Sequence, residues 1–179
     1  MMIIVDFAVD KGFQSNSVTL LSSFAVAEFF GRLASGWLTD KNLVRKRNIV
    51  SCCILLIGVI LSLTPSCRTF NVLLISAIGF GFVSGIIIIQ FSVLTMDYVG
   101  IDTLPIALGT SSFLVGITTA VRPIVVGTFR DNFGSYDGLF QFLGSISLIA
   151  ALLWLSEPFA QLWLKRYKRS NGFFRVIVV

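Results

Sequence analysis

The chain has 179 residues, of which 55% are hydrophobic and only 13% are charged. A soluble domain of this size usually has about 25% charged residues, so the composition excludes an ordinary soluble domain and predicts a protein that resides in lipid. The net charge of +5 comes from basic residues beside apolar runs. This placement favours contact with a membrane surface and excludes nucleic acid as the expected partner.

Several kinds of catalytic chemistry are excluded by the residues present. The chain has no histidine, so it has neither a histidine-based triad nor the commonest metal ligand. Its three cysteines, Cys52, Cys53 and Cys67, form no C-x-x-C motif. We therefore expect no metal, no cofactor and no enzyme active site.

Apolar segments account for most of the chain. The first stretch, residues 1–13, has no basic n-region and is interrupted by Asp6 and Asp10. It is therefore interpreted as the end of a truncated transmembrane helix and not as a signal peptide. Five longer segments follow, each near the ~17–25 residues that cross a bilayer. They predict helices at 17–38, 48–64, 70–96, 103–128 and 139–157 within a region 14–157, followed by a basic tail at 158–179.

The distribution of lysine and arginine predicts the orientation in the membrane. With five crossings, the loop after the first segment and the C-terminal tail lie on one side. That side carries nine basic residues, against three on the other: Lys41, Arg45, Lys46, Arg47, Lys165, Arg166, Lys168, Arg169 and Arg175 against Lys11, Arg68 and Arg130. Because basic residues resist translocation, this side and the C-terminus are predicted to be cytoplasmic.

Two opposite charges lie inside the first long segment. Glu28 and Arg32 are separated by four residues, a spacing that places them on one helix face. Each charge would cost about 2.5–3.5 kcal/mol at the bilayer centre, and a buried ion pair is poor evidence for stability. Two interpretations stay open. In the first interpretation, Arg32 binds an anionic substrate, and Glu28 pairs with Arg32 in the empty state and takes up a proton. In the second, the pair only fixes helix packing.

Further polar and small residues lie within the later segments. Arg122, directly before Pro123, either lines the same cavity or extends to the outer interface. Pro123 is expected to bend or break its helix. Gln90 bonds either a substrate or, the interpretation we favour, a neighbouring helix. Gly81–Gly85 forms a G-x-x-x-G pair that allows a second helix to approach closely.

The stretch "GRLASGWLTDKNLVRKR" resembles the motif that joins the second and third helices of each half in the major facilitator superfamily. The matching residues are Gly31, Gly36, Asp40, Arg45 and Arg47. The resemblance implies a cytoplasmic gating motif in which Asp40 pairs with a basic residue or caps a helix. A loop that only obeys the orientation rule would need the basic residues but not Asp40.

Two more stretches, "DFAVDKGF" and "RPIVVGTFRDNFGSYDGLF", together with Glu28-x-x-x-Arg32, look like the C-terminal half of a monocarboxylate transporter of that superfamily. The resemblance implies an all-α polytopic bundle: a six-helix half whose first helix is truncated and whose N-terminal half is missing. It also implies proton-coupled symport of monocarboxylates or related small organic anions, in the plasma membrane.

The residues of the implied site depart from the family pattern at two positions. The family acid that corresponds to Glu28 is commonly aspartate, and small residues usually precede the proline where Arg122 stands. Two alternatives to the function remain. The first is a major facilitator transporter of another solute, such as an amino acid, sugar or drug. The second is a non-transporting half that assembles with partners, for which an accessory membrane protein is one candidate.

Overall fold

The computed structural model describes residues 17–41, 46–67, 69–133 and 137–170. Within these ranges the regular structure is entirely helical. The elements are α2 (Ser17–Asp40), α3 (Lys46–Leu63), the short 3-10 helix η2 (Thr64–Ser66), α4 (Phe70–Val99), α5 (Leu104–Phe133) and α6 (Asp137–Ser170). The truncated helix end expected at 1–13 lies outside the described residues.

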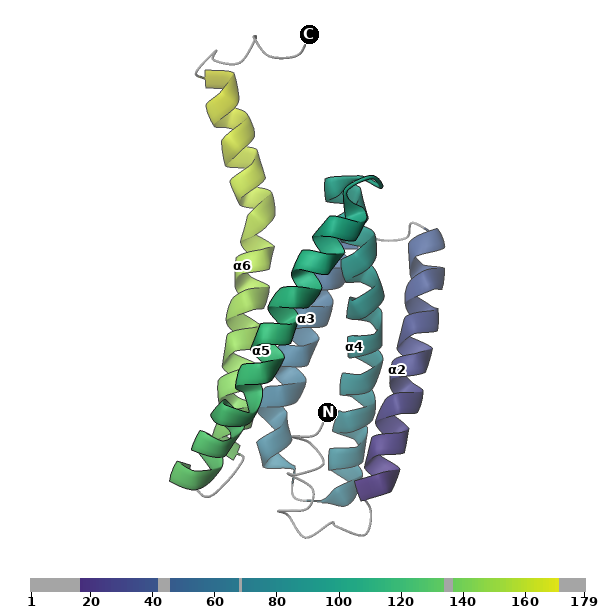
Figure 1. Ribbon diagram of the computed structural model, residues 1–179, viewed down its shortest axis with the longest axis vertical. Coiled ribbons are helices and arrows are strands. Elements are labelled where there is room, and N and C mark those ends of the chain that lie inside the picture. Colours follow the sequence, from purple (N-terminus) through teal and green to yellow (C-terminus); the bar gives the residue numbers. More distant parts are fainter. Residues whose placement is uncertain (1–16, 42–45, 68, 134–136, 171–179) are drawn as a thin grey trace.

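Consecutive helices run antiparallel, as short loops require (Figure 1). In the described part of the chain, five helices are long and apolar enough to cross a membrane, which confirms the prediction of a helical membrane bundle. Helix α6 continues to Ser170, beyond the predicted end of that segment at residue 157. The role of 158–179 as a cytoplasmic tail stays a prediction.

The helices form a row in which α4 packs against α2 and α3, and α3 packs against α6. A core cluster joins the ends of four helices near the predicted outer side: Leu20, Leu61, Cys67, Leu73, Ala77, Leu139 and Phe140. Farther toward the predicted cytoplasmic side, Ile49, Cys53 and Val83 form a second cluster between α3 and α4. Large apolar side chains cover much of the exposed surface, as expected where lipid is the solvent.

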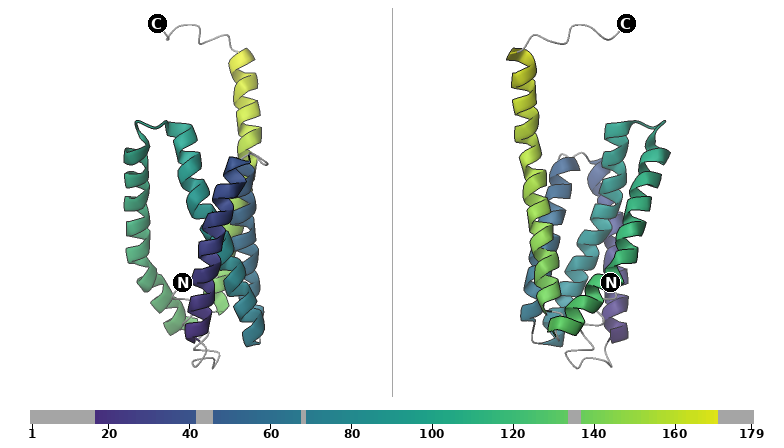
Figure 2. Two further views of the ribbon diagram at one scale, coloured as in Figure 1. Left: turned by 90° about the vertical axis from the view of Figure 1, so that its right-hand side faces the viewer. Right: turned by 60° about the vertical axis from the view of Figure 1, so that its left-hand side comes forward.

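Helix α5 is attached to the rest of the bundle mainly near its two ends. Leu104, Ala107, Leu108 and Ser111 are half-buried near its start, and 125–127 and Phe129 are half-buried farther along, while residues 112–124 between them are exposed. The helix passes through Pro123 without ending. It bends in the half that contains this proline (Figure 2), which agrees with the loss of a backbone donor there.

Two of the spans end at residues that favour turns. After α3, Pro65 lies in the 3-10 turn, and the Thr64 hydroxyl donates 2.7 Å to the carbonyl of Ile60. Helix α4 ends at Gly100, whose φ of 83° lies in the region that favours glycine. The Gly100 amide donates 3.0 Å to the carbonyl of Met96 and closes the last turn.

Candidate functional site

The predicted ion pair forms within α2. The Arg32 guanidinium donates through Nη2 to Oε1 of Glu28, one turn earlier on the same helix. Half of the Arg32 side-chain surface (50%) is exposed, against 21% for Glu28. No other described charged group pairs with either residue. The pair is therefore charge-balanced while the guanidinium keeps an accessible surface.

Glycines bring the backbones of α2 and α4 into direct contact. A methyl group added at Gly31 of α2 would overlap the backbone oxygen of Phe82, and one added at Gly81 of α4 would lie 2.6 Å from the backbone oxygen of Phe24. Neither position has room for a side chain. The prediction that the G-x-x-x-G pair allows a close helix approach is confirmed.

The other glycine of that pair lies against the candidate site itself. A methyl group at Gly85 would overlap the carbonyl oxygen of Glu28 and come within 3.0 Å of the amide nitrogen of Arg32. The backbone of α4 thus contacts the turn of α2 that carries both charges. Their position relative to α4 is fixed by main-chain contact and not by flexible side chains.

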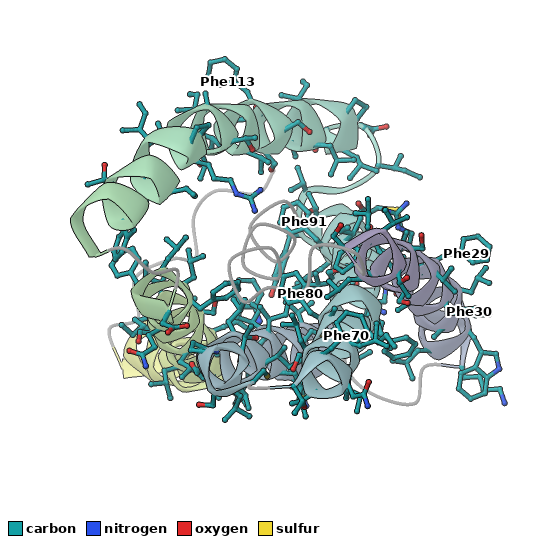
Figure 3. The ribbon with its side chains drawn as sticks, turned by 90° about the horizontal axis from the view of Figure 1, so that it is seen from below. Phe29, Phe30, Phe70, Phe80, Phe91 and Phe113 are labelled. Atoms are coloured by element: carbon teal, nitrogen blue, oxygen red, sulfur yellow. The ribbon has the colours of Figure 1, made fainter. Side chains whose placement is uncertain are left out.

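The two charges and an apolar groove lie on different sides of the α2–α4 contact. The groove has a volume of about 640 Å³ and is lined mainly by apolar and small residues: Ser22, Ser23, Val26, Ala27, Phe30, Ile78, Gly79 and Phe82. Phe30 points away from α5 (Figure 3). Glu28 precedes it by two residues, which is about 200° around a helix of 3.6 residues per turn. Glu28 and Arg32 therefore lie on the side nearer α5.

Arg122 lies on the face of α5 that is turned toward the bundle. Val125, Val126 and Phe129 pack against the core cluster near the predicted outer side. They follow Arg122 by three, four and seven residues, the spacing of one helix face. Phe113, nine residues before Arg122 and about two and a half turns away, points away from the bundle (Figure 3). Arg122 itself is exposed.

Gln90 is buried and bonds a neighbouring helix. Its Nε2 donates 2.8 Å to the hydroxyl oxygen of Thr39 on α2, and the Thr39 hydroxyl donates 2.9 Å to the carbonyl of Ser35. This is the interpretation that the sequence favoured for Gln90. The bond joins α2 to α4 close to the predicted cytoplasmic end, away from Glu28.

A second ionic contact joins α3 to α4 at the same end. Lys46, the first residue of α3, donates to both carboxylate oxygens of Asp97 near the end of α4, at 3.0 and 2.8 Å. The sequence analysis did not identify this pair. Alternate loops between five crossings lie on the same side of the membrane, so the predicted topology brings the loops that carry Lys46 and Asp97 to one side, which was the available signal.

The remaining gating-motif residues are only partly described. Gly36 has open space around it, so close packing does not account for a glycine there. Arg47 is half-buried at the start of α3. Arg45 and the side chain of Asp40 lie outside the described part of the chain. The predicted contact of Asp40 with a basic residue therefore stays a prediction.

Comparison of the sequence with known proteins places the chain in a family. Residues 1–176 match the model described as Major Facilitator Superfamily. The chain is 29% identical to "Monocarboxylate transporter 12-B" of Danio rerio, over 97% of this chain and 37% of that protein. It is 28% identical to "Monocarboxylate transporter 12" of Mus musculus, over 97% and 35%. It is 30% identical to "Monocarboxylate transporter 9" of Rattus norvegicus, over 78% and 27%. The chain spans about a third of the length of the relatives that it matches over most of its own length.

Proposed function

Because the chain belongs to the Major Facilitator Superfamily, we propose that it forms the C-terminal half of a proton-coupled symporter for monocarboxylates or related small organic anions. Its similarity to proteins named monocarboxylate transporters supports this substrate class. The observation that carries the proposal is the ion pair between Glu28 and Arg32 within a membrane-spanning helix, with half of the arginine side chain exposed.

Arg32 is the proposed carboxylate ligand. A guanidinium offers parallel N–H donors that match the two oxygens of a carboxylate. In the empty site, one of its nitrogens donates to Glu28. Since Glu28 lies on the same helix, breaking this pair does not require α2 to move relative to another helix.

Glu28 is the proposed proton carrier. When the carboxylate takes up a proton, it loses its negative charge and no longer competes with the substrate for Arg32. The charge of the occupied site then equals that of the empty site, because the substrate carboxylate replaces the Glu28 carboxylate. Proton and anion would therefore enter and leave together, which is symport.

The second wall of the pathway would come from an N-terminal half. Facilitators bind substrate between two halves that move around a central site. In this chain, Glu28 and Arg32 lie on the side of α2 nearer α5, away from the apolar groove. We place this side toward the other half, in a plasma-membrane protein whose C-terminus is cytoplasmic.

Uptake by variants of Arg32 tests the proposal. The full-length protein with Arg32→Leu, reconstituted in vesicles with an inward proton gradient, should lose the uptake of a monocarboxylate such as pyruvate. Arg32→Lys keeps the charge but not the forked donors, and should retain weak uptake with a raised KM. Leu33→Ala, an exposed position next to it, is the control for surface substitutions. Undiminished proton-dependent uptake by Arg32→Leu contradicts the role of Arg32.

Neutral analogues separate the remaining alternatives. If pyruvate is not carried but an uncharged or zwitterionic solute is, another branch of the superfamily is identified. If no solute is carried and the protein is recovered with a partner, the assembly alternative holds.

A further inference from the structure

We propose that Arg122 is a second anion-binding residue, separate from Arg32 and nearer the predicted outer side of the pathway. The proposal rests on the proposed function, because it assumes that organic anions pass along the side of α2 that carries Arg32. The substrate class is unchanged, but its route would have two cationic positions instead of one.

The placement of Arg122 is the first support. Arg122 shares a helix face with Val125, Val126 and Phe129, which pack against the core cluster. Leu104, at the start of α5, is half-buried and lies eighteen residues before Arg122, about five full turns away. Both ends of the helix thus identify the same inward face, and Arg122 lies on it between them.

The surroundings of Arg122 are the second support. The middle of α5, residues 112–124, is exposed although its two ends pack against the bundle. Thr118, one turn before Arg122 on the same face, adds a hydroxyl. This part of the inward face therefore carries the polar side chains of Thr118 and Arg122 beside the exposed Val115 and is uncovered in the described structure, whereas the opposite face carries Phe113 (Figure 3).

Charge balance is the third support. Among the described residues, no carboxylate pairs with Arg122, whereas the Arg32 charge is balanced by Glu28. An unpaired arginine within the membrane is unfavourable unless it faces a polar path or meets an anion. A transiting anion supplies the missing charge.

Depth separates the two arginines. Arg32 lies eight residues before the end of α2, and Arg122 lies eighteen residues after the start of α5. At 1.5 Å per residue, these are roughly 12 and 27 Å from the predicted cytoplasmic ends of the two helices. An anion that enters from the outer side would therefore meet Arg122 before it meets Arg32.

Thiol labelling tests the local field of Arg122 without any need for transport. Thr118→Cys in a cysteine-free full-length protein serves as the reporter, and Phe113→Cys serves as the control on the opposite face. Thr118→Cys should react with membrane-impermeant methanethiosulfonates, and Phe113→Cys should react at least about tenfold more slowly because lipid covers it. The reporter should also prefer an anionic over a cationic reagent, and Arg122→Gln should lower that preference about tenfold. Equal labelling of both cysteines, no labelling of Thr118→Cys, or an unchanged preference overturns the proposal.

Transport kinetics then test the role in substrate binding. Arg122→Gln should raise the KM for pyruvate uptake about tenfold, the value of one hydrogen bond to a charged group, while Arg122→Lys should restore most of the affinity. An unchanged KM in Arg122→Gln, with uptake abolished by Arg32→Leu, overturns this inference and leaves the proposed function standing. If the unsubstituted protein carries no carboxylate, the proposed function fails, and the labelling result still decides whether Arg122 attracts anions.

Discussion

Replacing Gly85 by alanine tests whether the α2–α4 contact positions the two charges. The added methyl group would overlap the carbonyl oxygen of Glu28 and approach the amide nitrogen of Arg32. Both atoms belong to the backbone, so no rotamer change relieves the overlap, and the two helices must separate. Overpacking of this kind costs about 1–3 kcal/mol in a packed interior.

Gly81→Ala is the matched control, because it crowds the same contact one turn away from the charges. Its methyl group would lie 2.6 Å from the backbone oxygen of Phe24, which is 0.8 Å short of the 3.4 Å at which ordinary van der Waals contact begins. Both variants should therefore separate the helices by a similar distance and unfold at lower temperature in detergent. Only in Gly85→Ala is the displacement centred on the turn that carries Glu28 and Arg32.

The two variants should differ in the apparent affinity for pyruvate, measured per folded molecule. A displacement of about 1 Å in a binding group can cost up to about a hundredfold in activity. We expect Gly85→Ala to raise the KM for pyruvate at least about tenfold and Gly81→Ala to leave it within about twofold. The assay is uptake in vesicles, normalised to the protein that elutes as a folded species. Equal KM values for the two variants would refute the idea that this contact positions the site.

Three further predictions concern residues near the predicted cytoplasmic end. Thr39→Val removes the acceptor of the buried Gln90 amide, so the free energy of unfolding should fall by about 1–3 kcal/mol. Thermal unfolding in detergent measures this change, and an unchanged midpoint would contradict the value assigned to this bond. The side chains of Lys46 and Asp97 are 26% and 42% exposed, so a double-mutant cycle should give a coupling free energy of only about 0.2–1 kcal/mol. A larger coupling would indicate a buried network. Gly36→Ala meets nothing within 4 Å, so it should be neutral or stabilise α2 by up to about 1 kcal/mol through helix propensity; a loss of folded protein would reveal a contact that lies outside the described residues.

The architecture could be predicted because its signals are local. Each membrane span corresponds to a predominantly apolar run, and the loops between the spans correspond to short polar breaks. The end of the last helix shows the limit of this signal. Apolarity predicts where a segment leaves the lipid, whereas a helix continues as long as its backbone bonds do, and α6 continues to Ser170.

The contacts of the candidate site also differ in how far the sequence predicts them. The pairing of Glu28 with Arg32 follows from their spacing within one helix, and the structure contains it. The Lys46–Asp97 and Thr39–Gln90 contacts each join residues that are 51 positions apart. No periodicity within a single helix encodes such contacts, because they depend on how the helices are aligned with one another.

The placement of Arg122 on the inward face of α5 rests on helical spacing in the sequence and on packing in the structure. The sequence left two positions open, a cavity wall or the outer interface. The residues that follow Arg122 at helical spacing are apolar, and from sequence alone they suit contact with lipid as well as contact with protein. Their packing against the core cluster in the structure indicates that this helix face is turned toward the bundle, while the role of Arg122 in a pathway stays a proposal.

The central claim is that Glu28 carries the proton while Arg32 holds the anion, and net uptake compared with exchange in Glu28→Gln tests it most directly. This substitution preserves shape and mimics the protonated carboxyl. Vesicles preloaded with pyruvate should exchange it for labelled pyruvate at a rate near that of the unsubstituted protein. The same variant should fail to accumulate pyruvate against its gradient when an inward proton gradient is imposed. Proton-driven accumulation that persists in Glu28→Gln would contradict the account.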